Sequence, residues 1–263
     1  MGHPGIPIAL LLIALLGVWL GIFGPLPTGA ASWIHQWQTL LAAIVASTIA
    51  SIAAYVAFQN TSRSLAHAES LETNRRHRKH AAVRAVLPLA LSQVIAYAER
   101  SARTLNELVG KCEGETLPTG VATDRLVEPL PSETLKSLAD FIEYTDTTSV
   151  EVIESTVAWI QILDARMRSI VQDNNDPSGT HVVVRAGIEG RIIDAATIYA
   201  GAASAFDYAR RRRADLPATL LWDAVLGALR NMHIWDHEYP RLYQIIEGRQ
   251  SNSSGPFERL GTG

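Results

Sequence analysis

The first 62 residues of the chain contain no lysine, arginine, aspartate or glutamate, and this feature constrains the fold more than any other. A soluble element rarely runs so long without charge, because charged side chains are mostly found on the hydrated surface. Two apolar runs stand out within the segment, at residues 6–23 and 38–58. Each is close to the ~20 residues that a helix needs to cross ~30 Å of hydrocarbon. We therefore predict a transmembrane helical hairpin in residues 1–60.

The segment between the two apolar runs predicts a short turn outside the membrane, because a glycine and two prolines there break the first helix. Trp33 and Trp37 precede the second run, and indole rings favour the headgroup level. We assign both to the membrane interface, together with Arg63 beyond the second run. The alternative is that the first run is a cleaved signal peptide, with small residues 30–32 at the cleavage site.

Small residues recur every four positions in both runs. They are Gly17 and Gly21 in the first run, and Ala42, Ala46, Ala50 and Ala54 in the second. Such stripes let helix backbones approach closely in lipid. We expect them to pair the two spans within the hairpin. A homodimer through the same stripes is the alternative.

The distribution of charge predicts the topology. Residues 63–103 carry eight basic and three acidic side chains, whereas residues 104–263 carry 15 basic and 23 acidic ones. The centre of the basic zone is the run Arg75, Arg76, Arg78 and Lys79. Because lysine and arginine favour the cytoplasmic side, we expect a multi-pass protein of the bacterial inner membrane with its C-terminal domain in the cytoplasm.

The basic run has a second potential role as a contact for anionic lipid headgroups. A straight helix would carry Arg75 about 25 Å beyond Phe58, at 1.5 Å per residue. That distance is several times the ~8 Å over which salt screens charges. A bent or tilted helix would bring the run back to the headgroups, so the sequence leaves lipid contact open.

Beyond the basic run, apolar residues recur at helical spacing and almost no strand pattern is present. We predict an all-α fold with a bundle of about four to six helices. The expected parts are a basic juxtamembrane helical stalk at residues 61–82, the bundle at 83–248 and a disordered tail at 249–263. Pro88 is expected to kink a helix or to start a new one. Further helices are expected from Ser132, after a capping box at residues 148–151, over about 181–210, from Pro217, and over 240–247. The helix at 181–210 is apolar on most sides, so we expect it to be central in the bundle.

No catalytic residue and no cofactor is predicted. A single cysteine, Cys112, excludes an internal disulfide and any metal site built on a cysteine pair. The glycine-rich phosphate loop, the dinucleotide fingerprint, the zincin motif and the nucleophile elbow are all missing from the sequence.

The segment MHIWDHEYPRLY, residues 232–243, offers the only candidate metal ligands. His233 and His237 would share one face of a helix, with Asp236 and Glu238 beside them. A proline interrupts the segment, so we favour a helix–helix corner whose aromatic side chains pack on the core.

Four consecutive arginines, Arg210 to Arg213, stand at the end of the helix predicted at 181–210. Cations there stabilise the negative end of the helix dipole, and a solvated helix end is the expected role. Arginines also bind phosphate or anionic lipid. Nucleic acid is not expected, because the zone is net acidic and has no interleaved aromatics for base stacking.

Two segments resemble uncharacterised bacterial inner-membrane proteins of the alphaproteobacterial type, which have two spans. They are WIHQWQTLLAAIVA at residues 33–46 and NTSRSLAHAESLETNRRHRKHAAVRAVLPLALS at residues 60–92. The resemblance implies a transmembrane hairpin with a helical cytoplasmic domain, and it implies no activity.

The predicted function is a membrane-tethered helical interaction or scaffold module. Its expected partners are the lipid bilayer and a protein, which can be a second copy of the chain. One alternative is an enzyme or metal-binding bundle around His233 and His237. The other is a regulator that responds to anionic lipid through the basic run.

Overall fold

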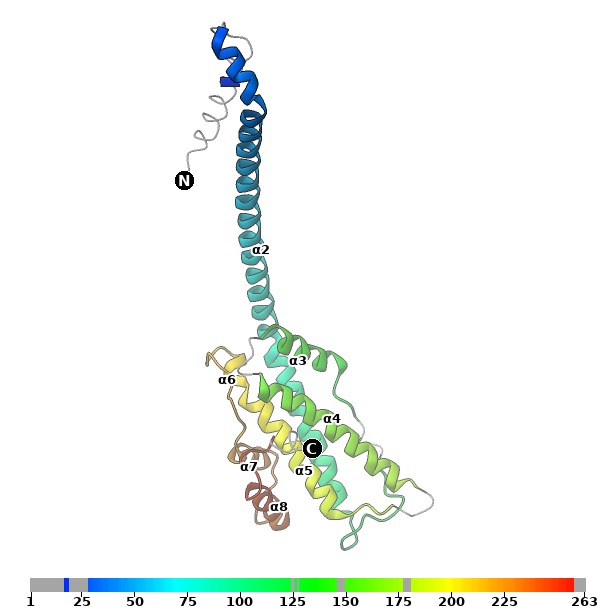
Figure 1. Ribbon diagram of the computed structural model, residues 1–263. Helices are drawn as coiled ribbons and strands as arrows, with labels where there is room; N and C mark the ends of the chain where they lie inside the picture. Colours follow the sequence, from blue (N-terminus) through cyan, green and yellow to red (C-terminus); the bar gives the residue numbers. More distant parts are fainter. Residues whose placement is uncertain are drawn as a thin grey trace. The chain divides into compact units, whose positions relative to one another are not determined.

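A computed structural model of the chain describes residues 17–18, 28–123, 126, 128–145, 150–176 and 181–257. Within these ranges the regular structure is helical, apart from two isolated antiparallel bridges (Figure 1). The all-α prediction is therefore confirmed. The chain divides into two units, Met1–Arg75 and Arg76–Gly263. The first predicted span lies outside the described residues except for Gly17 and Val18, so the hairpin stays a prediction.

Helix α2 runs over Thr28–Val109 and differs from the prediction in two ways. It begins about ten residues before the expected second span, and it continues through Pro88, where we expected a kink or a new start. Proline lacks the N–H that the helix ladder uses, so the helix forgoes one hydrogen bond there. Burial of the following turns against the second unit's core stabilises the helix across this position.

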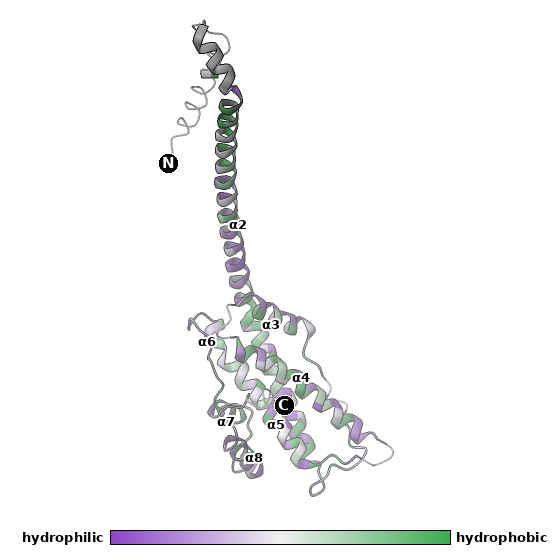
Figure 2. Ribbon diagram, viewed as in Figure 1, coloured by the Kyte–Doolittle hydropathy of each residue, from purple (hydrophilic) through white to green (hydrophobic). Residues whose placement is uncertain are grey.

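One helix in the described part of the chain, within α2, is long and apolar enough to cross a membrane by length and composition. None of its apolar window is buried in the structure. Figure 2 shows the hydrophobic residues concentrated in the earlier described turns of α2, with hydrophilic residues following. The exposed large apolar side chains in this part include Leu40, Ile44, Ile49, Tyr55, Val56 and Phe58. Exposed apolar surface of this kind is typical of contact with lipid or protein.

Helix α5, Arg185–Ser204, is the central helix of the second unit. It packs against α4, Glu151–Asn174, and against α7, Trp222–Asn231. Because α5 is rich in alanine and isoleucine, most of its residues are buried, and its central position agrees with the prediction for residues 181–210. The remaining helices are α3, Ser132–Tyr144, α6, Phe206–Ala209, and α8, Pro240–Gln250.

Two predicted helix starts are wrong. Residues 181–184 are extended, and Leu117 N–H donates to the carbonyl oxygen of Val183 at 2.9 Å. Three consecutive β-branched valines favour this conformation. The helix expected from Pro217 begins instead at Trp222. The starts at Ser132 and Pro240 agree with the prediction.

We expected a disordered tail from residue 249. The chain instead makes contacts with the bundle as far as residue 257. Trp222 Nε1 donates to the carbonyl oxygen of Ser253 at 3.3 Å. Phe257 packs against the hydrophobic core. These contacts join residues distant in sequence, so the polar composition of the tail did not reveal them. Residues 258–263 lie outside the description.

Candidate functional site

Two basic segments that are far apart in the sequence meet in the second unit. One lies on α2 around His80 and Arg84, and the other is the arginine run that follows α6. Together they line a hollow of about 500 Å³, which we call the basic hollow. Its lining residues are His80, Ala81, Arg84, Arg211, Arg212, Arg213 and Ala214. None of these residues is acidic, so the hollow is electropositive.

The arginine run closes helix α6 with a defined backbone. Arg211 N–H donates to Tyr208 O at 2.9 Å, and Arg212 N–H donates to Asp207 O at 2.7 Å. This pair of bonds is a Schellman motif, in which the residue after the cap adopts a left-handed conformation. Arg211 has φ 60°, in the region that favours glycine. The arginines therefore follow the helix end at Ala209, whereas we expected them within a last turn.

Arg84 fastens this loop to α2. Its Nε and Nη2 atoms donate to Tyr208 O at 3.0 and 2.7 Å, and Nη2 also donates to Arg213 O at 2.9 Å. The guanidinium carbon lies 3.8 Å from the centroid of the Tyr208 ring. Arg84 thus satisfies carbonyl groups at the helix end and covers an aromatic face. We assign Arg84 a positioning role, because its N–H groups already donate hydrogen bonds to backbone carbonyl groups of the protein.

Tyr208 is buried, and its ring lies beneath the guanidinium group of Arg84. Its hydroxyl lies 3.0 Å from Nε2 of His80, and its ring meets Phe141 edge-on at 5.9 Å between centroids. Burial raises the pKa of the Tyr208 phenol, while Arg84 lowers it and Asp215 raises it by smaller amounts. The phenol is therefore protonated at neutral pH and adds no negative charge to the site.

The remaining arginines differ in the contacts that their side chains make within the protein. Arg211 and Arg212 are exposed, and within the described residues their side chains have neither an ion pair nor a hydrogen bond. Arg213 Nε lies 4.0 Å from Asp207 Oδ2, in an exposed pair of the kind that contributes little. Arg210 lies 4.8 Å from the centroid of the Phe206 ring. The charge available to a ligand is therefore chiefly that of Arg211 and Arg212.

The residues of the predicted basic run differ in their exposure to solvent. Arg75, Arg76 and Arg78 are exposed on α2, as is Arg63 earlier in the helix. Lys79 is half-buried, and its Nζ donates to the Tyr144 hydroxyl at 2.8 Å. Lys79 is thus a contact within the second unit, and lipid contact by the exposed arginines stays a prediction.

The residues predicted to act in the membrane are only partly described. The side chain of Trp33 and all of Gly21 lie outside the described part. Trp37 is exposed on α2, and Gly17 is helical. The small-residue stripe, Ala42, Ala46, Ala50 and Ala54, is exposed along α2. Its pairing with another helix stays a prediction.

The structure places His233 at a helix end. His233 N–H donates to Arg230 O at 3.0 Å, and Ile234 N–H donates to Leu229 O at 2.9 Å. This is a second Schellman motif, with His233 at φ 61° and the buried Ile234 and Leu229 as the apolar pair that accompanies it. The helical face that we considered for His233 and His237 does not form, because α7 ends at Asn231.

His237 lies between two exposed carboxylates, 3.6 Å from Asp236 and 3.8 Å from Glu238. Across the described residues, no group of three or more His, Cys, Asp or Glu side chains is arranged to hold a metal. The corner interpretation agrees with the position of Tyr239, whose hydroxyl accepts a hydrogen bond from Asn106 at 2.8 Å. Trp235 is instead 39% exposed, contrary to our expectation that it packs on the core.

His233→Gly is expected to stabilise the second unit by about 0.5 kcal/mol. Glycine removes the cost of a side chain in the left-handed region, and its greater freedom in the unfolded chain offsets part of this gain. The shift in Tm is expected to be roughly 1–2 °C, measured by thermal unfolding. A fall in Tm would show that the imidazole makes a stabilising contact and would contradict the capping role.

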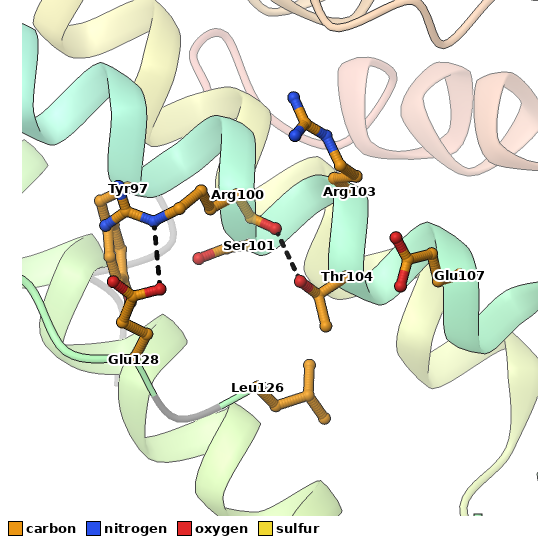
Figure 3. Close-up of a pocket in the computed structure, with 8 residues that line it drawn as sticks. All are labelled: Tyr97, Arg100, Ser101, Arg103, Thr104, Glu107, Leu126 and Glu128. Carbon is orange, nitrogen blue, oxygen red and sulfur yellow. Dashed lines mark hydrogen bonds and ion pairs between the residues drawn. The ribbon is translucent and has the colours of Figure 1, made fainter. Parts of the chain in front are cut away.

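A second hollow of about 460 Å³ lies between α2 and the segment that precedes α3 (Figure 3). An ion pair of 3.5 Å between Arg100 and Glu128 spans it, and Thr104 donates to the Arg100 carbonyl at 3.0 Å. Tyr97 is buried, and its hydroxyl has no hydrogen-bond partner among the described residues. Burial, and then the charge of Asp164, raise the pKa of Tyr97 to about 12. Two arginines and two glutamates line this hollow, so its charge selects no class of ligand.

Sequence reasoning missed two buried carboxylates on α5. Both are at most 4% exposed, and each is paired with two arginines. The pairs are Asp194 with Arg166 and Arg249, and Glu189 with Arg185 and Arg241. Because the arginines come from α4, α5 and α8, these ion pairs brace the bundle around α5. The signal in the sequence was the presence of two acidic residues in a helix rich in alanine and isoleucine.

Comparison with known proteins gives no match, since no family model matches the chain and no curated protein or solved structure is similar to it. The resemblance at residues 33–46 and 60–92 therefore stays a prediction. The function is inferred from the chain's own residues.

Proposed function

We propose that the chain is a membrane-tethered helical binding module whose bundle recognises an anionic group in the basic hollow. The observation that carries this proposal is the convergence of α2 and the arginine run, held together by Arg84. Positively charged donors that face one hollow without an acidic neighbour in its lining suit the binding of an anion. An acidic protein partner is the other occupant with suitable charge.

The tether is proposed to be the apolar part of α2, which would form one membrane-spanning helix of a two-span hairpin in the bacterial inner membrane. Support comes from the uncharged first 62 residues and from the exposed apolar side chains of α2. The excess of basic residues after the second run supports a cytoplasmic position for the bundle.

Cys112 gives a direct test of this topology, because it is the chain's only thiol. We expect a membrane-impermeant maleimide to label it only after the cells are lysed, in chain recovered from the membrane fraction. The thiol is half-buried, and burial raises its pKa, so less thiolate is present at neutral pH than in a free cysteine. The labelling rate should therefore continue to rise with pH above about 8.5, the ordinary pKa.

Cys112→Ser supplies the control without a thiol, and denatured protein supplies the maximum labelling. Labelling in intact cells would overturn the cytoplasmic position of the bundle. Recovery of the chain in the soluble fraction would overturn the tether.

A further inference from the structure

We infer that the ligand of the basic hollow is a multiply charged phosphate group, bound by the side chains of Arg211 and Arg212. This inference rests on the proposed binding role of the hollow and adds the chemistry of the ligand. The source is either a soluble phosphorylated compound or a phosphate-bearing lipid headgroup, which present the same group to the site.

The donors of the hollow match phosphate. The guanidinium group is a planar fork that binds phosphate oxygens in pairs and keeps its charge at any physiological pH. Several guanidinium groups around one space favour a ligand with more than one negative charge. The volume of about 500 Å³ is in the range of small-molecule sites.

Arginine side chains lie over the rings of Tyr208 and Phe206 near the hollow, which argues against recognition of a nucleobase. Arg84 lies 3.8 Å from the centroid of Tyr208, and Arg210 lies 4.8 Å from that of Phe206. Base recognition of single strands depends on open aromatic faces for stacking. The hollow is therefore suited to the phosphate part of a ligand.

Arg211 supplies an independent observation. It occupies the left-handed position of the Schellman motif, where glycine fits at lower conformational cost. The same backbone also fixes the loop by two hydrogen bonds, so the site is preformed before the anion binds.

The roles within the site are divided. Arg84 is a positioning residue, since its hydrogen bonds to Tyr208 O and Arg213 O hold the loop against α2. Arg211 and Arg212 are exposed and available to the ligand. Removal of either charge should weaken binding without unfolding the loop, because their backbone N–H groups make the capping bonds.

The test uses the full chain in nanodiscs of phosphatidylcholine and measures pyrophosphate binding by titration calorimetry. Arg211→Gly is expected to weaken pyrophosphate binding about tenfold, as for the loss of one hydrogen-bonded charge, while Tm stays equal or rises. His233→Gly is the matched control, because it makes the same backbone change at the other Schellman motif. It should leave binding unchanged. Arg212→Gln should weaken binding by a similar factor.

Two further arms identify the source and the class of ligand. Tighter binding of a short-chain phosphatidic acid than of pyrophosphate would assign the phosphate to a lipid headgroup, and the reverse would assign it to a soluble compound. Equal or tighter binding of an acidic peptide would overturn phosphate as the ligand and leave the proposed anion-binding role intact. Absence of binding to all three anions would overturn both. Pyrophosphate binding that Arg211→Gly does not change would overturn the assigned site.

Discussion

Gly201→Ala is expected to destabilise the second unit by about 2–3 kcal/mol, although alanine is the better helix former. A Cβ atom on Gly201 would overlap Thr156 Oγ1 on α4 and would lie 3.1 Å from Phe257 Cζ. Thr156 is buried and donates to Val152 O at 2.6 Å, so its hydroxyl cannot move aside without losing that bond. The close approach of α4 and α5 thus depends on glycine at this position. Denaturant unfolding followed by circular dichroism measures the loss.

Gly227→Ala is the matched control for this prediction. Gly227 lies within α7, and a Cβ there would meet nothing within 4 Å. Its replacement should stabilise the unit by up to about 1 kcal/mol through helix propensity. The double variant Thr156→Ala with Gly201→Ala should be less destabilised than the two single changes added together. Equal stability of Gly201→Ala and the unchanged protein would contradict the close packing of α4 against α5.

Asp194→Asn is expected to destabilise the second unit by about 2–3 kcal/mol. The carboxylate is 1% exposed and pairs with Arg166 and with Arg249, the latter at 3.2 Å. Loss of its charge removes the ion pair with Arg249, which is 15% exposed, and breaking a buried pair from one side is costly. The expected loss of stability is smaller than that for a fully buried pair, because Arg166 is 46% exposed and water screens its charge. Denaturant midpoints with an unchanged slope would measure the effect.

Glu128→Gln supplies the comparison for a surface pair. Glu128 is 70% exposed and lies 3.5 Å from Arg100, so its loss should change stability by less than about 0.5 kcal/mol. If the Asp194 and Glu128 variants unfolded at the same denaturant concentration, the bracing role of the α5 carboxylates would be wrong.

The helical class was predictable because it depends on local patterns. Apolar residues at helical spacing predicted α3, α4, α5 and α8, and the apolar surroundings of α5 predicted its central position. Two of the expectations that failed depend on distant partners. The valines at 182–184 are extended beside residues 115–117, and Pro88 continues α2 because the turns after it are buried.

The candidate site was predictable only in its parts. The sequence showed the four arginines after residue 209, whereas no residue of the predicted basic run at residues 75–79 lines the hollow. It also suggested a metal site at His233 and His237, which the helix end at Asn231 excludes as a helical pair. No periodicity in either segment indicates that Arg84 would donate to Arg213 O, 129 positions later in the chain.

The sequence by itself determined the helical class, the uncharged apolar segment and the order of the charged zones, because each follows from the solvent preference of nearby residues. The tertiary structure alone decided that two basic segments line one hollow, that Arg211 and His233 occupy left-handed helix caps, and that buried carboxylates on α5 are paired with arginines. The hollow and the pairs of Asp194 with Arg166 and Arg249 require atoms from distant parts of the chain to lie within about 3 Å, a distance at which hydrogen bonds and ion pairs form. Such contacts are set by the packing of α4, α7 and α8 against α5.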